Sequence, residues 1–153
     1  MYFTQENEKN LVSPLTSVHY NYYIEEHSLD VTNNLPHSHY ATLLINDVSL
    51  EVDENGTLLY FWGLCPIVYA TKTEINIPNY VVNRVRCLDA MLEQSSICSI
   101  NVEKWPVYLD STKDIICIGN KNSKNVIKFN SDSYVGLNDG QLETVWIKFN
   151  FVN

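Results

Sequence analysis

The sequence predicts a mainly β fold, an antiparallel β-sandwich or a partly closed barrel. Two turn signals carry this prediction, because Asn55-Gly56 and Asp139-Gly140 each join segments with strand patterning. A third observation is that short apolar segments recur along the second half of the chain, separated by polar turn clusters. The length of 153 residues suits a single domain, 1–153.

The first predicted hairpin surrounds Asn55-Gly56. Residues 48–53 alternate apolar and polar side chains, which predicts a strand with one face in solvent. Residues 57–62 are apolar on both faces, which predicts a more central strand. Asp47, Ser49, Glu51 and Asp53 would then project from one solvent-facing side at intervals of about 6.5–7 Å.

The other strands follow from β-branched and aromatic segments between turn residues. They are expected at residues 17–24, 39–45, 97–102, 107–109, 115–118, 125–129, 133–137 and 141–152. One stretch departs from this pattern, because the apolar residues of 78–94 have nearly helical spacing. It predicts one short helix near 80–94, although its valines favour a strand.

The charge of the chain is concentrated in its first half. Residues 1–71 contain nine acidic residues and one lysine, whereas residues 72–153 contain nine acidic and nine basic residues. A net charge of -8 argues against nucleic acid as a partner, because phosphate contacts need a basic surface. An acidic strand favours a basic protein partner. The alternative is a solvated face that keeps the protein soluble and discourages edge pairing.

The sequence is typical of a soluble cytoplasmic protein. The N-terminal residues 1–10 are acidic and polar, unlike a signal peptide, and no apolar run approaches the roughly 20 residues of a membrane helix. We therefore expect no membrane partner. The four cysteines lack CxxC spacing and predict buried free thiols, with a disulfide or a metal site as the alternatives; they are Cys65, Cys87, Cys98 and Cys117.

No residue pattern indicates catalysis. Two imidazoles in His37-Ser-His39 would share a metal on a strand, but the third ligand is missing and a polar turn is preferred. Cys65 precedes a proline and lacks a feature that would lower its pKa, which favours a structural turn. A pair of carboxylates for glycoside hydrolysis stays an open alternative, because the spacing of such a pair is set by the fold. We therefore expect no enzyme activity, no cofactor and no metal.

Three blocks of the sequence resemble a known family. They are residues 52–66, residues 104–110 continuing to 115–119, and residues 142–148. Together they resemble small β-rich bacterial immunity proteins, which protect cells from polymorphic toxins, notably those of contact-dependent growth inhibition systems. The blocks are packing and turn motifs and cover roughly the last two thirds of the chain. Residues 1–46 match no family.

The resemblance implies a protein that binds a cognate toxin and neutralises it without catalysis. Such toxins are often nucleases with basic active-site clefts, which an acidic protein occludes by matching the electrostatic potential. The residues predicted to contact the toxin are an acidic strip, a second acidic patch and three aromatic anchors. They are Asp47, Glu51, Asp53 and Glu54; Glu25, Glu26 and Asp30; and Tyr22, Tyr23 and Tyr40.

The alternative function is a small-ligand or carbohydrate-binding β-domain without catalysis. It would use tryptophan or tyrosine side chains as platforms for a sugar. The three tryptophans, Trp62, Trp105 and Trp146, are expected in the core instead.

Overall fold

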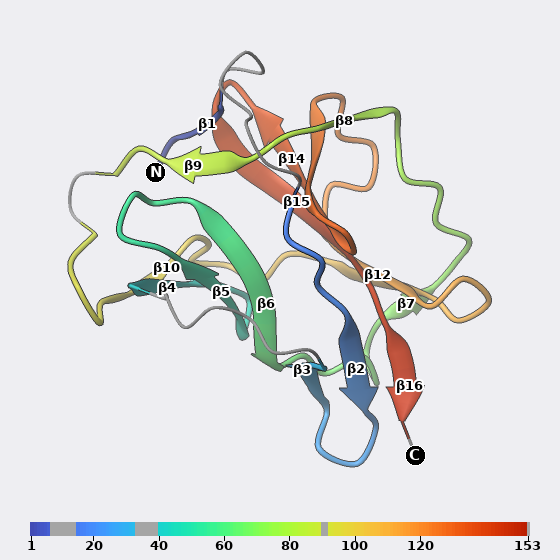
Figure 1. Ribbon diagram of the computed structural model, residues 1–153. Coiled ribbons are helices and arrows are strands. Elements are labelled where there is room, and N and C mark those ends of the chain that lie inside the picture. Colours follow the sequence, from blue (N-terminus) through green and yellow to red (C-terminus); the bar gives the residue numbers. More distant parts are fainter. Residues whose placement is uncertain (7–14, 33–39, 90–91, 153) are drawn as a thin grey trace.

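The computed structural model describes residues 1–6, 15–32, 40–89 and 92–152 and is an all-β sandwich (Figure 1). Two seven-stranded sheets pack together, and a two-stranded sheet lies beside them. The predicted fold class is therefore confirmed as a sandwich. No segment within the described ranges forms a helix that would span a bilayer.

The first sheet contains most of the N-terminal half of the chain. In spatial order its strands are β10 (Ile97–Ser99), β4 (Ala41–Ile45), β5 (Val48–Val52), β6 (Leu58–Leu64), β3 (Ser28–Val31), β2 (Tyr20–Tyr23) and β16 (Asn150–Val152). The strands β4, β5 and β6 pair antiparallel, and β5 and β6 form the hairpin predicted around Asn55-Gly56. The described residues of 1–46 thus contribute three strands to this sheet.

The second sheet contains the later strands. In spatial order they are β7 (Thr71–Lys72), β11 (Val107–Asp110), β12 (Ile115–Gly119), β15 (Gln141–Lys148), β14 (Ser133–Asn138), β13 (Val126–Asn130) and β8 (Tyr80–Val82). The turn between β14 and β15 has φ of 51° at Asp139 and 78° at Gly140, the two positive values that a tight hairpin turn needs. The small sheet pairs β1 (Phe3–Gln5) with β9 (Val85–Cys87).

The hydrophobic core lies between the two large sheets. Leu43, Leu50 and Phe61 enter it from the first sheet, and Ile116 and Ile147 enter it from the second. A second, smaller cluster includes Trp146 and Cys117 of the second sheet and Ile75, which lies on the segment from β7 to β8. Because β7 and β8 are opposite edges of the second sheet, this segment crosses from one edge to the other.

Two sequence predictions are corrected here. Residues 141–152 are not one strand, because Phe149 is buried against Tyr22 and the chain then continues in the first sheet, where β16 lies beside β2 (Figure 1). The short helix expected near 80–94 is absent from the described residues of that stretch, which form β8 and β9. These valine-rich segments follow β-propensity instead of the approximate helical spacing.

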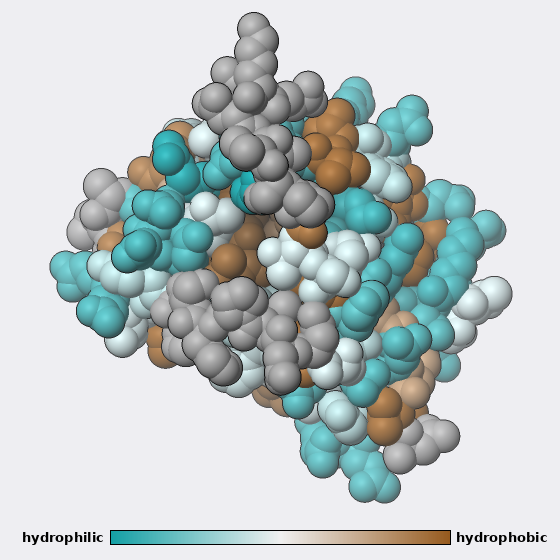
Figure 2. Space-filling model, in the orientation of Figure 1, coloured by the Kyte–Doolittle hydropathy of each residue, from teal (hydrophilic) through white to brown (hydrophobic). Residues whose placement is uncertain are grey.

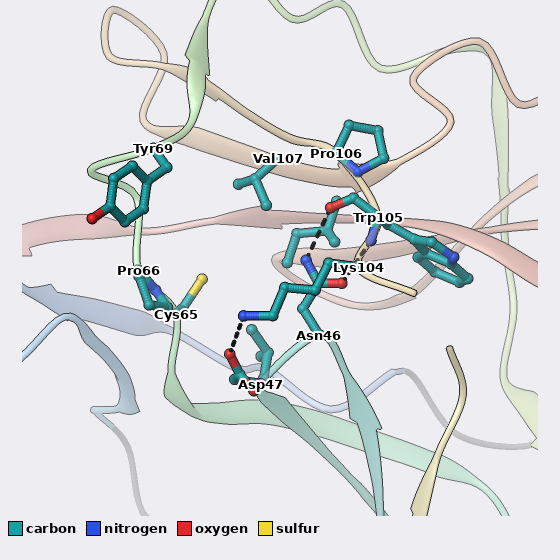
Figure 3. A pocket seen from close by; sticks show the side chains of 11 residues that line it. Asn46, Asp47, Cys65, Pro66, Tyr69, Lys104, Trp105, Pro106 and Val107 are labelled. Atoms are coloured by element: carbon teal, nitrogen blue, oxygen red, sulfur yellow. Dashed lines mark hydrogen bonds and ion pairs between the residues drawn. The ribbon is translucent and has the colours of Figure 1, made fainter. Parts of the chain in front are cut away.

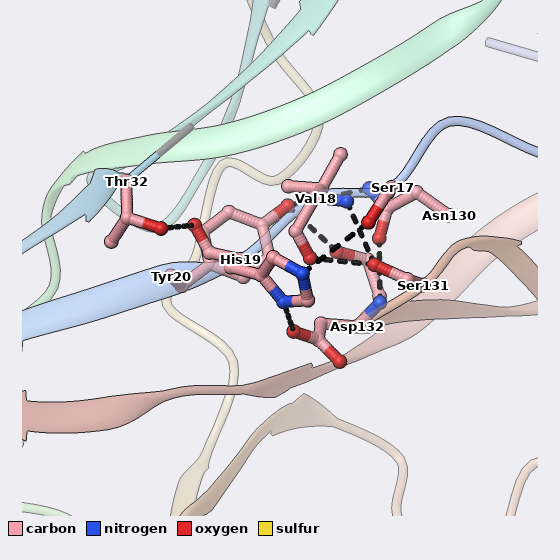
Figure 4. A network of polar contacts seen from close by, with 9 residues as sticks. Ser17, Val18, His19, Tyr20, Thr32, Asn130, Ser131 and Asp132 are labelled. Carbon is pink, nitrogen blue, oxygen red and sulfur yellow. Dashed lines mark hydrogen bonds and ion pairs between the residues drawn. The ribbon is translucent and has the colours of Figure 1, made fainter. Parts of the chain in front are cut away.

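A buried tyrosine hydroxyl joins the two sheets. Tyr20 of β2 is fully buried, and its hydroxyl lies 2.7 Å from the hydroxyl of Ser133 in β14. The same oxygen accepts hydrogen bonds from the backbone N–H of Phe61 in β6 and from the side-chain amide of Asn130. Figure 4 shows this network around the β13–β14 turn. Burial raises the pKa of Tyr20 to about 12, so the hydroxyl stays neutral at physiological pH.

The polar contacts continue towards the surface beside Tyr20. Ser131 accepts a hydrogen bond from the backbone N–H of Val18 and donates one to the carbonyl of Val18. The ring of His19 lies 3.2 Å from a carboxylate oxygen of Asp132 (Figure 4). The β13–β14 turn is therefore hydrogen-bonded to the segment that enters β2, through both backbone and side-chain groups.

Tyr20→Phe is expected to destabilise the protein although it removes one atom. The substitution leaves the N–H of Phe61 without its acceptor in a dry interior, which costs about 1–3 kcal/mol of unfolding free energy. Urea unfolding measures this loss. Tyr23→Phe is the matched control, because Tyr23 lies half-buried on the same strand and its hydroxyl makes no hydrogen bond within the described ranges. Equal losses in both variants would contradict the role of the Tyr20 hydroxyl.

Candidate functional site

The tertiary structure separates the charges of the two large sheets. None of the seven strands of the first sheet contains lysine or arginine, whereas strands of the second sheet contain Lys72, Lys128 and Lys148. The separation arises because five strands of the first sheet come from the acidic half of the chain. The outer face of the first sheet, which points away from the core, is the candidate partner-binding surface.

The strand expected to face solvent is instead buried on both sides. All five residues of β5 are buried, and Glu51 is only 3% exposed. The reason is its place in the sheet, because β4 and β6 flank β5 and carry side chains that cover its polar face. Apolar and polar residues alternate along β5 as expected, but the prediction that this strand presents a solvent-accessible acidic strip was wrong.

Glu51 holds two neighbouring side chains on the outer face. Its Oε1 accepts a hydrogen bond of 2.9 Å from the hydroxyl of Thr42 on β4 and one of 2.6 Å from the indole N–H of Trp62 on β6. Its other oxygen, Oε2, is buried and has no hydrogen-bond partner in the part of the chain that the structure covers. Burial, and then the negative charge of Glu51, raises the pKa of Tyr60 opposite it.

The exposure of Trp62 was predicted wrongly from the sequence. The side chain was expected in the core but is 44% exposed, while Trp146 is buried as expected. Leu64 of β6 and Ile97 of β10 are also exposed, at 49% and 67%. The sequence holds no signal for this exposure, because it depends on which residues cover the outer face of β6.

The other members of the predicted acidic strip have separate environments. Asp47 is exposed, and its carboxylate forms an ion pair of 3.0 Å with Lys104. Asp53 caps the β5–β6 turn by accepting hydrogen bonds from the backbone N–H groups of Asn55 and Thr57. Glu54 is exposed at the same turn. The four residues of the predicted acidic strip therefore lie in four different environments and do not form one charged surface.

The second predicted patch is exposed. Glu25 and Glu26 lie at the tip of the β2–β3 hairpin, which forms the teal projection at the bottom of Figure 2. Asp30 lies on β3 and accepts a hydrogen bond from the backbone N–H of Val31. None of these three carboxylates forms an ion pair with any residue that the structure describes.

The predicted aromatic anchors differ in exposure. Tyr22 is fully buried and donates a hydrogen bond of 2.7 Å to the carbonyl of Cys65, so it is not available to a partner. Its prediction as an exposed anchor was wrong, because Tyr20 and Tyr22 alternate towards the core and Tyr23 points the other way. Tyr23 and Tyr40 are half-buried, and their contact with a partner stays a prediction.

The candidate chemical groups do not converge in the described residues. All four cysteines are free, and Cys65, Cys87 and Cys117 are buried. No group of three histidine, cysteine or acidic residues within the described ranges is arranged to hold a metal. His37 and His39 lie outside those ranges.

Cys65 is expected to be a poor nucleophile at neutral pH. Burial raises the pKa of its thiol from 9.0 to about 12, so about one molecule in 10⁴ carries the reactive thiolate at pH 8. A pulse of iodoacetamide with peptide mass mapping should label the partly exposed Cys98 first and Cys65 far more slowly. The Cys65 rate should rise about tenfold for each pH unit. A Cys65 as reactive as free glutathione at pH 7 would contradict this assignment.

No protein-family model matches the chain, and no curated protein matches it. The function is therefore inferred from the charge and geometry of the chain itself.

Proposed function

We propose that this protein is a cytoplasmic immunity protein that binds and neutralises a basic protein toxin, and that this toxin is a nuclease. The observation that carries the proposal is a seven-stranded sheet whose strands contain no lysine or arginine. With the acidic hairpin tip of β2–β3 beside it, this surface lacks the charges that would repel a basic partner.

The outer face combines features that protein interfaces use. Trp62 is half-exposed and its indole is held by the carboxylate of Glu51, so little rotamer entropy is lost when a partner covers it. Leu64 and Ile97 add exposed apolar area. Tryptophans in such positions often contribute a large share of binding energy. The proposed division of roles is that Trp62 holds the complex, while Glu25, Glu26 and Asp30 attract it.

The experiment that tests the function is co-expression with the gene immediately upstream, followed by affinity capture from the source cell's lysate. Capture of a stoichiometric basic protein that kills cells when expressed alone, and is harmless with this chain, would support the proposal. Binding should weaken as salt rises, since exposed charges are screened beyond about 10 Å at 0.1 M. Capture of no toxic protein at low or moderate salt would overturn it.

Reversing the charge of the hairpin tip should slow association with the captured toxin. Glu25→Lys with Glu26→Lys is expected to lower the association rate at least tenfold at low salt, with little change in dissociation. Stopped-flow mixing measures both rates. Glu74→Lys with Glu143→Lys is the matched control, because it changes the net charge equally but lies on the β7–β8 segment and on the second sheet. Equal slowing by both pairs would exclude the tip as the docking region.

Trp62→Ala should accelerate dissociation of the same complex. An anchor tryptophan contributes about 2 kcal/mol or more, which corresponds to roughly thirtyfold weaker binding. Trp62→Phe keeps the ring but loses the hydrogen bond to Glu51, so it should fall between the wild type and the alanine variant. Unchanged dissociation of a folded alanine variant would place the interface elsewhere.

A further inference from the structure

A cavity of about 350 Å³ opens between the two large sheets at one end of the sandwich (Figure 3). Its walls come from the β4–β5 turn, the chain after β6, and the chain that enters β11. Most of the lining is apolar or aromatic: Val48, Pro66, Tyr69, Trp105, Val107 and Ile118. The volume lies within the range of about 300–1,000 Å³ in which proteins bind small molecules.

The Trp105 wall of the cavity is fixed by an asparagine clamp. The side chain of Asn46 accepts a hydrogen bond of 2.9 Å from the backbone N–H of Trp105 and donates one of 3.1 Å to its carbonyl. Asn101 holds Asn46 in turn. Its side-chain amide donates a hydrogen bond to Oδ1 of Asn46, and its own Oδ1 accepts one from the backbone N–H of Asn46. Because the clamp forms within the chain itself, the cavity is shaped before any ligand arrives.

The mouth of the cavity is electrically neutral. Lys104 and Asp47 form an ion pair of 3.0 Å across it (Figure 3), and they are the only charged residues of its described lining. The thiol of Cys65 lies in the lining and stays protonated at neutral pH, because burial raises its pKa to about 12. A charged ligand would gain no net attraction there and would break the ion pair to bind.

We propose that this cavity is a binding site for an uncharged, apolar small molecule. Val48, Pro66, Val107 and Ile118 supply apolar contacts for such a molecule. Tyr69 is 92% exposed at the rim, and its ring points away from the other labelled residues (Figure 3). The site is independent of the proposed toxin interface.

The test titrates the full chain, labelled with ¹⁵N, with three related probes and no toxin present. Indole is neutral, indole-3-acetate is an anion and tryptamine is a cation. Indole should shift the backbone amide signals of Val48, Lys104, Trp105 and Val107 saturably, with one site per chain. The two charged probes should bind at least tenfold more weakly. Tighter binding of a charged probe, or shifts that do not saturate or spread over other surfaces, would overturn the proposal.

Two variants separate binding in the cavity from adsorption elsewhere. Val107→Phe narrows the cavity and should weaken indole binding at least tenfold, whereas Trp62→Phe, on the outer face of the first sheet, should leave it unchanged. Unchanged affinity in a folded Val107 variant would exclude this cavity as the site.

Discussion

The buried hydroxyl of Tyr20 is the contact on which the arrangement of the two sheets depends. The backbone of β6 is bulged, and the N–H of Phe61 finds its acceptor in Tyr20 instead of in a neighbouring strand. The carbonyl of Leu59 in the same strand accepts a hydrogen bond from Asn130 of the second sheet. Because an unpaired backbone group is costly in a dry interior, these side chains set how the sheets meet.

This arrangement also sets what each surface offers. With β5 enclosed by β4 and β6, the carboxylate of Glu51 is unavailable as a surface charge and serves to hold Trp62. The β4–β5 turn carries Asn46 and Asp47, which shape and close the cavity beside Trp105. One hairpin therefore contributes both to the proposed partner-binding face and to the proposed ligand site, on opposite sides of its turn.

Much of the fold was predictable because it depends on local chemistry. Asn55-Gly56 and Asp139-Gly140 predict their hairpins correctly. The β-branched segments of the second half of the chain form strands close to the predicted positions. The departure of β16 from β15 was not predictable, because it follows from the burial of Phe149 against Tyr22 of a distant strand. Strands β1 and β9 likewise depend on pairing between segments some 80 residues apart.

The sequence by itself determined the all-β class, the two hairpins and the concentration of negative charge in the first half of the chain. Those features follow from backbone preference, turn chemistry and composition, which act within a few residues. Only the tertiary structure decided that this acidic half supplies five of the seven strands of one sheet without lysine or arginine, that Glu51 and Tyr22 are buried, and that Trp62 is exposed. The exposure of a side chain depends on the residues packed around it. Those around Glu51 come from the flanking strands β4 and β6, and those around Tyr22 include Phe149, which is distant in the chain.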